Sequence, residues 1–454
     1  MQLKNVIDSP CALRAMLDSL DLQSTMARRR LLEMEMLTDA HDIGRSYDTL
    51  RHFARFLATA HHTRVTTLQF KLQALKDIGT TLNNLDRHAV LDDIELFEVK
   101  HLALLAGDVN EIMREHGLEQ VVPVPSLDEV VTILDPDGLK IASFYIYDSY
   151  CGRLKELRAE MRRQPERNDE LLLEASEIER TVRADLSKRL QPFAAALAQA
   201  LTALAHIDIY LAKATQMTQL GLCFPTISRD GTSRFEGMFH PRVKAALEAG
   251  GRSFQPIDIT YGLKPTLITG ANMGGKTVVL KTLTLCQYLF QFGFGIPAAS
   301  AVMDIKSHIF FCIGDEQSVE KGLSSFAAEM KNIDAVIKAS RHERKLLALI
   351  DEPARTTNPT EGTALVAALL KVLAHASMSL ILTTHYDIEP GEARCLRVKG
   401  FENGTMNYSL VEVHDGEVPH EALNIAQSLD IDPQWIALAR DIVNSTTTNR
   451  NIHH

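Results

Sequence analysis

One glycine-rich segment constrains the fold more than any other part of this 454-residue chain. Residues 267–277 read LITGANMGGKT and fit the pattern G-x-x-x-x-G-K-[ST]. The apolar run 266–269 precedes the loop, and residues 278–290 follow it without a proline or glycine. A strand, a glycine loop and a helix N-terminus in this order let backbone N–H groups converge on phosphate oxygens. The segment therefore predicts a buried strand, a phosphate-binding loop and a helix.

Two side chains at the end of this loop have predicted roles in holding a nucleotide. Lys276 would reach the β- and γ-phosphates, and Thr277 would offer its hydroxyl to Mg²⁺. Upstream, Phe254 could stack on an adenine, although a phenylalanine of the protein core explains the residue equally well. The rest of the loop would bind mainly through its backbone, from Gly270, Ala271, Asn272, Met273, Gly274 and Gly275.

An acidic motif about 75 residues downstream supplies the second strong signal. Residues 346–352 read LLALIDE, an apolar run that ends in two carboxylates. This pattern is typical of a buried parallel strand with its acids at the carboxyl end, where ligands bind in open α/β sheets. Asp351 would hold Mg²⁺, and Glu352 would be the base that orients the attacking water.

Two weaker patterns accompany these motifs. The run 380–385, LILTTH, predicts another buried strand that brings His385 to the same edge, where it could sense a γ-phosphate or be purely structural. Residues 322–330, GLSSFAAEM, place Ser324 and Ser325 at the start of a helix. Small hydroxyl residues there suit an anion, but they are also ordinary helix caps.

The remainder of the chain is predicted to be largely helical. Apolar residues recur at three- and four-residue spacing through the first 116 residues. Residues 130–134 and 141–147 instead predict two short strands around the turn DPDG. A long helix is then expected over 169–213, with Pro192 as a kink.

Composition and charge limit the classes of protein that this chain can belong to. Hydrophobic residues make up 45% and charged residues 23%, as in an ordinary globular protein. The net charge of −10 provides no global basic field for nucleic acid. No apolar run approaches a membrane span, and the N-terminus lacks a signal-peptide pattern. The six cysteines are scattered, which favours free thiols in the cytoplasm over disulfides or a zinc site.

These motifs together resemble those of a known family. Residues 237–445 are similar to the ATPase domain of the MutS family, a branch of the ABC-type ATPases. GANMGGKT resembles that family's phosphate loop, GLSSFAAEM its signature segment, IDEPARTTNPTEG its Walker B motif and D-loop, and TTHYD its histidine switch. The resemblance implies ATP and Mg²⁺ as ligands and a homodimer with head-to-tail ATPase domains. Ser324 and Ser325 would then face the γ-phosphate held by the partner chain, and residues 357–359 would lie along the dimer seam.

Two positions depart from the family pattern. Thr277 stands where the family usually has serine, which is chemically neutral. Pro353 follows the acids where mismatch-repair members usually carry a leucine and then a glycine, so the D-loop geometry is open. At the other end, residues 416–445 resemble the helix–turn–helix that closes MutS ATPase domains and packs on the partner subunit, with Asp432 as N-cap of the second helix.

The predicted organisation is an α/β P-loop ATPase domain preceded by an all-α core and lever domain. The expected boundaries are 1–221 for the helical domain, 222–415 for the ATPase domain, 416–445 for the helix–turn–helix and 446–454 for a disordered tail. The helical part resembles the MutS core and lever more loosely. No mismatch-reading domain has a counterpart in the sequence, so the chain resembles a short MutS-like form.

Two functions remain open at this point. A DNA-associated clamp follows from the family resemblance, although the acidic net charge does not favour it. The alternative is an ATP-driven dimer that remodels a protein client without binding DNA. The runs PHEALNIAQSLDID and TTHYD resemble short MutS-related proteins associated with reactivation of a cobalamin-dependent lysine 5,6-aminomutase. A purely structural role is disfavoured by the complete set of Lys276, Asp351, Glu352 and His385.

Overall fold

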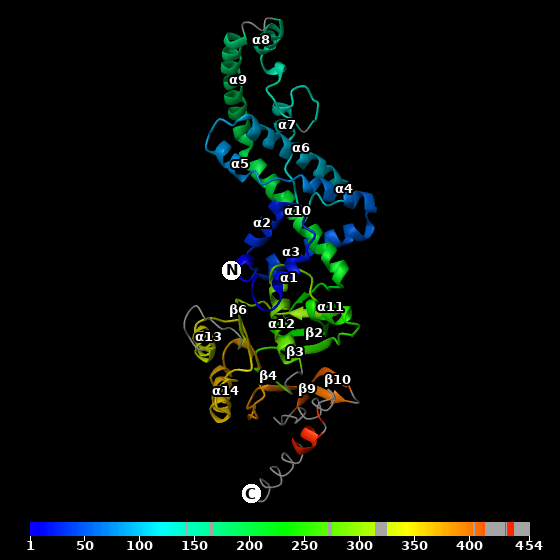
Figure 1. Ribbon diagram of the computed structural model, residues 1–454, viewed down its shortest axis with the longest axis vertical. Coiled ribbons are helices and arrows are strands. Elements are labelled where there is room, and N and C mark those ends of the chain that lie inside the picture. Colours follow the sequence, from blue (N-terminus) through cyan, green and yellow to red (C-terminus); the bar gives the residue numbers. More distant parts are fainter. Residues whose placement is uncertain are drawn as a thin grey trace, which may run out of the picture. The chain divides into compact units, whose positions relative to one another are not determined.

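A computed structural model shows a chain made of two compact units (Figure 1). The structure describes residues 1–141, 143–163, 168–270, 275–313, 325–402, 405–413, 432 and 434–439. The first unit, here called the helical unit, comprises Met1–Lys4, Leu20–Glu35 and Ser46–Gln216. The second, here called the sheet unit, comprises Asn5–Ser19, Met36–Arg45 and Met217–His454.

The described part of the helical unit is built mainly from helices, which confirms the helical prediction for the first 116 residues. Its helices are α2 (Thr25–Glu33), α3 (Ala40–Thr59, whose first residues belong to the sheet unit), α4 (His62–Gln73), α5 (Gly79–Asp86), α6 (Asp93–Glu115), α7 (Asp128–Leu134), α8 (Gly152–Arg163), α9 (Asn168–Leu190) and α10 (Ala194–Leu220, whose last residues belong to the sheet unit). Short 3₁₀ turns lie at η1 (Leu3–Asn5), η2 (Asp148–Tyr150) and η4 (Gln191–Phe193).

The long helix is interrupted where the sequence predicts a kink. Pro192 lies in the 3₁₀ turn η4, between the end of α9 at Leu190 and the start of α10 at Ala194. Proline lacks a backbone N–H and cannot continue the α-helical hydrogen-bond ladder. A tighter turn of helix therefore joins the two segments.

The two strands expected over 130–134 and 141–147 are wrong. Residues 128–134 form helix α7, because Val130 and Leu134 lie four residues apart and both are fully buried on one face. The described residues of 141–147 form no strand. The ammonium of Lys100 holds this loop instead, since its Nζ donates to Ser143 O at 3.2 Å and to Tyr147 Oη at 2.8 Å. Lys100 also pairs with Asp135 at 3.1 Å, so a buried cation and not a β ladder organises the loop.

Among its described residues, the sheet unit contains two sheets, the helices named below and a helical segment at residues 434–439. The larger sheet has the strand order β10-β9-β4-β8-β7-β6, and the smaller has the order β1-β5-β2-β3. The strands are β1 (Thr226–Ile227), β2 (Ser233–Met238), β3 (Ile257–Tyr261), β4 (Thr266–Thr269), β5 (Ser300–Met303), β6 (His308–Ile313), β7 (Leu346–Asp351), β8 (Met378–Thr383), β9 (Arg394–Glu402) and β10 (Thr405–Val413). The helices are α1 (Leu13–Asp18), α11 (Pro241–Ala249), α12 (Lys276–Gln291), α13 (Ser325–Ser340) and α14 (Pro359–Leu373).

The centre of the larger sheet is parallel and fully covered. Neighbouring strands from β6 through β7, β8 and β4 to β9 run parallel, and only β10 runs antiparallel to β9. Every residue of β4, β7 and β8 is buried. Strands buried on both faces require apolar residues at consecutive positions, which is the pattern that the sequence shows at 266–269, 346–351 and 378–383.

The boundary between the units differs from the predicted one at residue 221. Residues 5–19 and 36–45 belong to the sheet unit although they precede most of the helical unit in the chain. Two hydrogen bonds of 2.8 Å explain the second segment: Leu37 N donates to Gln291 O, and Gln291 Nε2 donates to Leu37 O. The end of α12 thus fixes this N-terminal segment by long-range contacts that sequence patterns do not reveal.

One helical stretch departs from the prediction that no apolar run reaches the length of a membrane span. Among the described residues, Asp169–Leu220 is long and apolar enough to cross a membrane by length and composition alone. However, 61% of its most apolar window is buried inside the fold. A helix that is apolar on most of its faces is also typical of the core of a globular protein.

The cysteines agree with the expectation of unpaired thiols. All six are free, and four of them, Cys11, Cys286, Cys312 and Cys395, are buried. Burial raises the pKa of the Cys286 thiol well above its usual value, so this side chain acts as a small apolar residue of the core.

Candidate nucleotide-binding site

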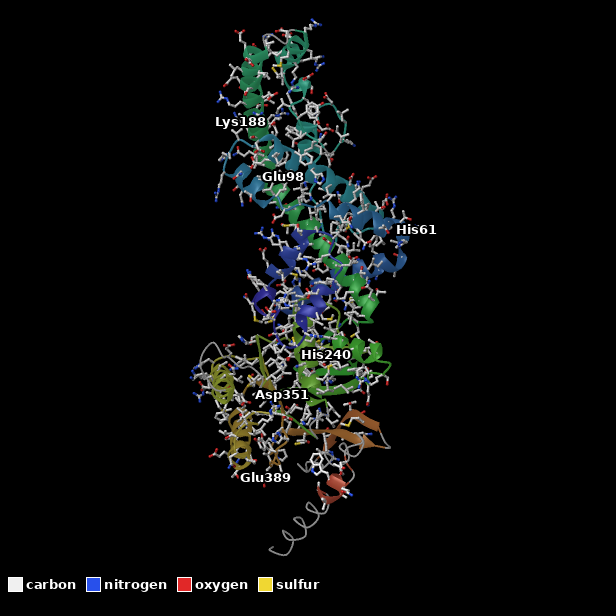
Figure 2. All side chains as sticks on the ribbon, in the orientation of Figure 1. His61, Glu98, Lys188, His240, Asp351 and Glu389 are labelled. Atoms are coloured by element: carbon white, nitrogen blue, oxygen red, sulfur yellow. The ribbon has the colours of Figure 1, made fainter. Side chains whose placement is uncertain are left out.

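The parallel register brings three strand ends to one edge of the larger sheet. Ile268 of β4 lies opposite Thr383 of β8, and Ile350 of β7 lies opposite Leu382 of β8. The residues at these ends therefore lie close together, as expected for an open α/β sheet. Figure 2 labels Asp351, the last residue of β7, within the sheet unit.

Asp351 is the centre of a network of hydroxyl groups at this edge. Its Oδ2 accepts a hydrogen bond of 2.7 Å from Thr277 Oγ1, and its Oδ1 accepts another of 2.7 Å from Thr383 Oγ1. Thr383 Oγ1 in turn accepts from Glu352 N at 2.9 Å. The predicted pair of Thr277 and Asp351 is thus in contact. Thr383 was not predicted as a site residue, because its only signal was its place at the end of the apolar run 380–382.

Lys276 is buried, and its ammonium group contacts both a backbone carbonyl and a carboxylate. It is 4% exposed, and its Nζ donates to Gly270 O at 2.8 Å and lies 3.2 Å from Glu352 Oε1. A buried lysine needs such partners because burial alone penalises its charge. Gly275, which precedes it as N-cap of α12, adopts a left-handed φ of 74° that favours glycine.

Glu352 and His385 face each other beside this lysine. The Glu352 side chain is 13% exposed, and its Oε2 lies 3.8 Å from His385 Nδ1. That nitrogen has no hydrogen-bond partner among the described residues, although the ring is only 33% exposed. The structure therefore places His385 at the expected edge, while its role as a phosphate sensor stays a prediction.

A pocket of about 260 Å³ lies beside the N-terminus of α12. Phe254, Tyr408 and Gly275 line it, together with apolar residues of α11 and α12. Phe254 is half-buried and borders this space, a position that suits stacking on a base better than packing in the core. Tyr408 was not predicted as a site residue, because it lies more than 130 residues after the loop and shares no sequence pattern with it.

Gln255 fixes one wall of this pocket. Its Nε2 donates to Asn407 Oδ1 and Ser409 Oγ, both at 3.0 Å, and its Oε1 accepts from Tyr408 N at 3.0 Å. Three hydrogen bonds from one amide anchor β10 next to the segment that carries Phe254. The two aromatic residues of the pocket are therefore held in place by the same side chain.

The described residues fit a nucleotide and a divalent cation. The hydroxyl of Thr277 and the carboxylate of Asp351 bring hard oxygen donors to one point, which is what Mg²⁺ requires. The Lys276 ammonium lies at the start of α12, where the helix dipole also favours an anion. The pocket is large enough for the ring system of a base and is mostly apolar.

Several predicted binding residues lie outside the described part of the chain. They are Ala271, Asn272, Met273, Gly274 and Ser324, and for Ser325 the structure gives only its place as the first residue of α13. Most of the predicted helix–turn–helix is also outside this part. Residues 434–439 are helical, and Asp432 accepts hydrogen bonds from Gln434 N at 2.9 Å and Trp435 N at 3.0 Å, as predicted for an N-cap.

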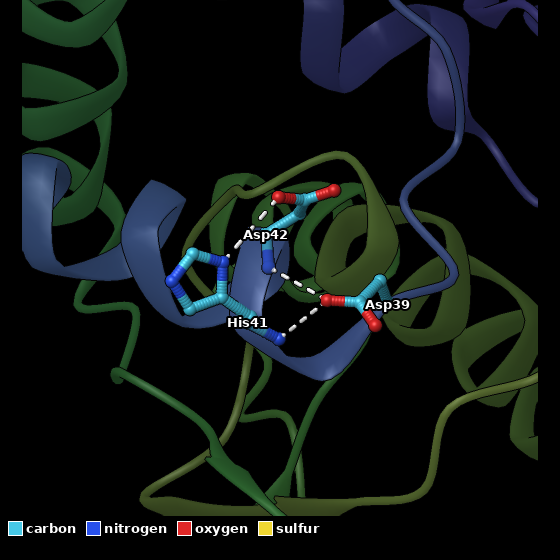
Figure 3. Close-up of side chains that lie close together, drawn as sticks. All are labelled: Asp39, His41 and Asp42. Atoms are coloured by element: carbon cyan, nitrogen blue, oxygen red, sulfur yellow. Dashed lines mark hydrogen bonds and ion pairs between the residues drawn. The ribbon is translucent and has the colours of Figure 1, made fainter.

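A second group of potential ligands occurs at the start of α3 (Figure 3). Ligand atoms of Asp39, His41 and Asp42 lie within 4.8 Å of one another. Asp39 Oδ1 accepts from the N–H groups of His41 and Asp42, and Asp42 pairs with Arg45 at 2.6 Å. The Arg45 guanidinium lowers the pKa of Asp42 through this bond. Helix capping and a surface ion pair account for the cluster without a metal.

Comparison with known proteins agrees with this geometry. Residues 266–408 match the family model of MutS domain V, and this range runs from β4 into β10. It includes the predicted phosphate loop, the acids at the end of β7 and directly after it, and the histidine after β8. This part of the chain is similar to domain V of the MutS family. Domain V is the domain that the motifs of this sequence resemble.

Individual relatives share between a quarter and just over a third of their length with the chain. The Endonuclease MutS2 of Levilactobacillus brevis is 32% identical over 290 residues, which cover 60% of this chain and 35% of that protein. The Endonuclease MutS2 of Streptococcus sanguinis is 36% identical over 216 residues, or 47% of this chain and 26% of that protein. The Endonuclease MutS2 of Thermomicrobium roseum is 34% identical over 289 residues, or 60% and 36%.

Proposed function

We propose that the sheet unit binds ATP with Mg²⁺ and hydrolyses it, and that the MutS-like chain uses ATP as a conformational switch. The observation that carries this proposal is the meeting of Lys276, Thr277, Asp351 and Glu352 at one edge of the parallel sheet. These residues come from the start of α12 and the end of β7. Such an edge is where phosphate-binding sites form in α/β proteins.

Each residue would have a distinct task in hydrolysis. Lys276 would exchange its pairing with Glu352 for the β- and γ-phosphates, which releases the carboxylate. Glu352 would then orient the attacking water and accept its proton. His385, whose Nδ1 has no partner among the described residues, would bond to the γ-phosphate. Mg²⁺, held by Thr277 and Asp351, would neutralise charge on the phosphate oxygens.

The proposed active form is a homodimer with head-to-tail ATPase domains. This part rests on the resemblance of GLSSFAAEM to the family's signature segment, since the structure describes one chain. Ser324 and Ser325 would complete the site of the partner chain. Mixing a Ser324→Ala chain with a Glu352→Gln chain tests this, because one composite site in the mixed dimer then keeps all of its residues. Activity that never rises above the sum of the two separate variants contradicts the arrangement.

DNA is the proposed partner of the switch. The relatives carry the name endonuclease, and the similarity to the MutS family favours a DNA-associated protein. The helical unit gives no added support, because its arginines are extensively paired with acids. Arg153 contacts Glu174 at 2.8 Å, and Arg158 contacts Asp148 at 2.6 Å. An ATP-driven action on a protein client, such as a cobalamin-dependent aminomutase, is the alternative and requires no basic surface.

The deciding experiment is the ATPase rate of the purified chain with and without duplex, mismatched and branched DNA, at low and moderate salt. A basal rate that depends on Mg²⁺ and disappears in Lys276→Ala supports the ATPase. Salt-sensitive DNA binding that changes this rate supports the DNA-associated function. A basal rate that no DNA alters contradicts it and favours the protein client. No hydrolysis by the wild-type chain contradicts the proposed activity.

A further inference from the structure

The turn that follows the two acids is held in an unusual backbone conformation. Glu352 has a φ of 44° and Ala354 a φ of 61°, both in the left-handed region that favours glycine. Non-glycine residues are strained in this region because Cβ comes too close to the following carbonyl oxygen. Pro353 lies between them and restricts the turn further. Other groups must therefore stabilise this conformation.

The peptide groups of Ala354 are bound on both sides by side chains from distant segments. Ala354 N donates to Glu329 Oε1 at 3.2 Å, and Tyr386 Oη donates to Ala354 O at 2.8 Å. Glu329 lies on α13, whereas Tyr386 follows His385 after β8. Ala354 itself is fully buried, so water does not replace these bonds.

The Tyr386 side chain is held in one position by burial and by close packing against its neighbours. It is 6% exposed, and its backbone N donates to Thr384 Oγ1 at 3.0 Å. A Cβ added to Gly362 of α14 would overlap the Tyr386 hydroxyl, so the glycine makes room for it. The ring also lies 4.3 Å from the His385 ring, centroid to centroid. Burial, followed by the charges of Glu329 and Glu352, raises the pKa of Tyr386, which keeps its hydroxyl protonated as a donor.

We propose that Glu329 and Tyr386 are positioning residues that clamp the peptide of Ala354 and thereby fix the carboxylate of Glu352 for attack by water. The inference rests on the proposed function, because it takes Glu352 as the base. The clamp joins α13, β7 and the segment after β8, which carry the signature segment, the two acids and the histidine. A displacement of about 1 Å at a reacting group is enough to reduce a rate about a hundredfold.

The test uses the full chain and variants that remove one contact each. Tyr386→Phe removes only the hydroxyl, Glu329→Ala removes the acceptor, and Glu329→Gln retains an acceptor oxygen. Tyr261→Phe, at a buried position of β3, and Glu343→Ala, at an exposed position beyond α13, are matched controls. For each chain, the ATP dissociation constant, kcat and the hydrogen–deuterium exchange of the peptide 350–358 are measured.

We expect Tyr386→Phe and Glu329→Ala to lower kcat about tenfold to a hundredfold while the ATP dissociation constant changes by less than about twofold. Exchange in the peptide 350–358 should rise in both variants, and Glu329→Gln should recover most of the rate. The controls should match the wild type. Equal losses in affinity and kcat in the clamp variants, or wild-type kcat and exchange in both, would overturn the clamp.

The exchange measurement separates this inference from the proposed function. A wild-type chain that does not hydrolyse ATP contradicts the ATPase, and the exchange of the peptide 350–358 then still shows whether the two side chains hold the turn. An active wild type with unchanged clamp variants contradicts the clamp alone. If Tyr386→Phe does not fold, the comparison of Glu329→Ala with Glu329→Gln decides the matter.

Discussion

Each unit contains a buried lysine paired with a carboxylate, but the two pairs differ in how far the carboxylate is open to solvent. In the helical unit, Lys100 and Asp135 are each 1% exposed at the side chain and are paired inside a closed network. In the sheet unit, Lys276 is buried to a similar extent, but its carboxylate partner Glu352 is partly open to solvent and faces His385. A closed pair fixes a loop, whereas a pair at the carboxyl edge of a parallel sheet, with one partner partly open to solvent, can be exchanged for a ligand.

Another buried carboxylate of the helical unit repeats the closed pattern. Asp208 is fully buried and accepts from Gln23 N, Ser24 N and Ser24 Oγ at 3.0, 2.8 and 2.7 Å. Burial raises the pKa of Asp208 despite these donors. All three hydrogen bonds that Asp208 accepts connect the start of α2 to α10. The comparison teaches that burial of a charge alone does not identify a site.

The largest effect on ATP binding and turnover is expected from replacing Lys276. Lys276→Ala should lower ATP affinity by more than about a hundredfold and abolish turnover, because the charge that meets the phosphates is lost. The thermal midpoint should change little, because Glu352 can then gain solvent. Calorimetric titration with ATP and a melting curve measure both. Unchanged ATP affinity contradicts the assignment of the phosphate loop.

Replacing Lys100 should affect stability and leave ATP binding unchanged, which is the opposite of the result expected for Lys276. Lys100→Met leaves Asp135 buried without its cation, which should lower the free energy of unfolding by about 3–5 kcal/mol. ATP affinity should be unchanged. The matched control is Lys71→Met, since Lys71 pairs with Asp108 at the surface, where removal costs about 0–1 kcal/mol. Equal destabilisation by the two variants removes the distinction between closed and surface pairs.

The base of the site should affect rate without affecting stability. Glu352→Gln should bind ATP at least as well as the wild type, because Lys276 loses a competing carboxylate. Its turnover should fall by about a hundredfold or more, since the amide cannot accept the proton. Single-turnover kinetics with a binding titration resolves the two quantities. Normal turnover excludes Glu352 as the base.

A smaller effect should appear in the pH dependence of the sheet unit. His240, the N-cap of α11, is 3% exposed, and burial lowers its pKa to about 4. The unfolded chain therefore binds more protons than the folded chain between about pH 4 and the ordinary histidine value near 6.5. Stability should accordingly fall as the pH is lowered through this window.

His240→Asn keeps an oxygen that can cap α11 but removes the titrating imidazole. As the pH is lowered through this window, its thermal midpoint should therefore fall by a few degrees less than that of the wild type. The helical unit offers a matched control. Burial lowers the pKa of Lys213 to about 7, so Lys213→Met should change the profile only above that pH, where wild-type stability rises. If the thermal midpoint of His240→Asn falls as much as that of the wild type over this pH window, the assigned pKa is wrong.

The candidate site was accessible from sequence because its strongest signals are local. The glycines at 270 and 275, the order of strand and helix around them, and the acids at 351 and 352 each occur within a few residues. Parallel strands with carboxyl ends at one edge then require these groups to meet. Tyr408 and Thr383 escaped notice because their positions depend on strand pairing across more than 100 residues.

The strands expected over 130–134 and 141–147 failed for a related reason. Their β-branched and aromatic residues favour strands locally, but Val130 and Leu134 pack as one helix face and Lys100 holds the following loop. Tertiary contacts outweighed propensity there. The positive φ of Ala354 is likewise invisible in an alanine and follows from the contacts of Glu329 and Tyr386.

By itself, the sequence determined the strand and the helix on either side of the predicted phosphate loop, the acidic strand and the helical character of the N-terminal part, because each depends on the spacing of neighbouring residues. Only the tertiary structure decided that residues 36–45 belong to the sheet unit and that Tyr408 and Phe254 line the same pocket. It also decided that two side chains from different segments hold the turn after Glu352. These features depend on contacts between residues far apart in the chain, and burial selects such contacts without leaving a local pattern.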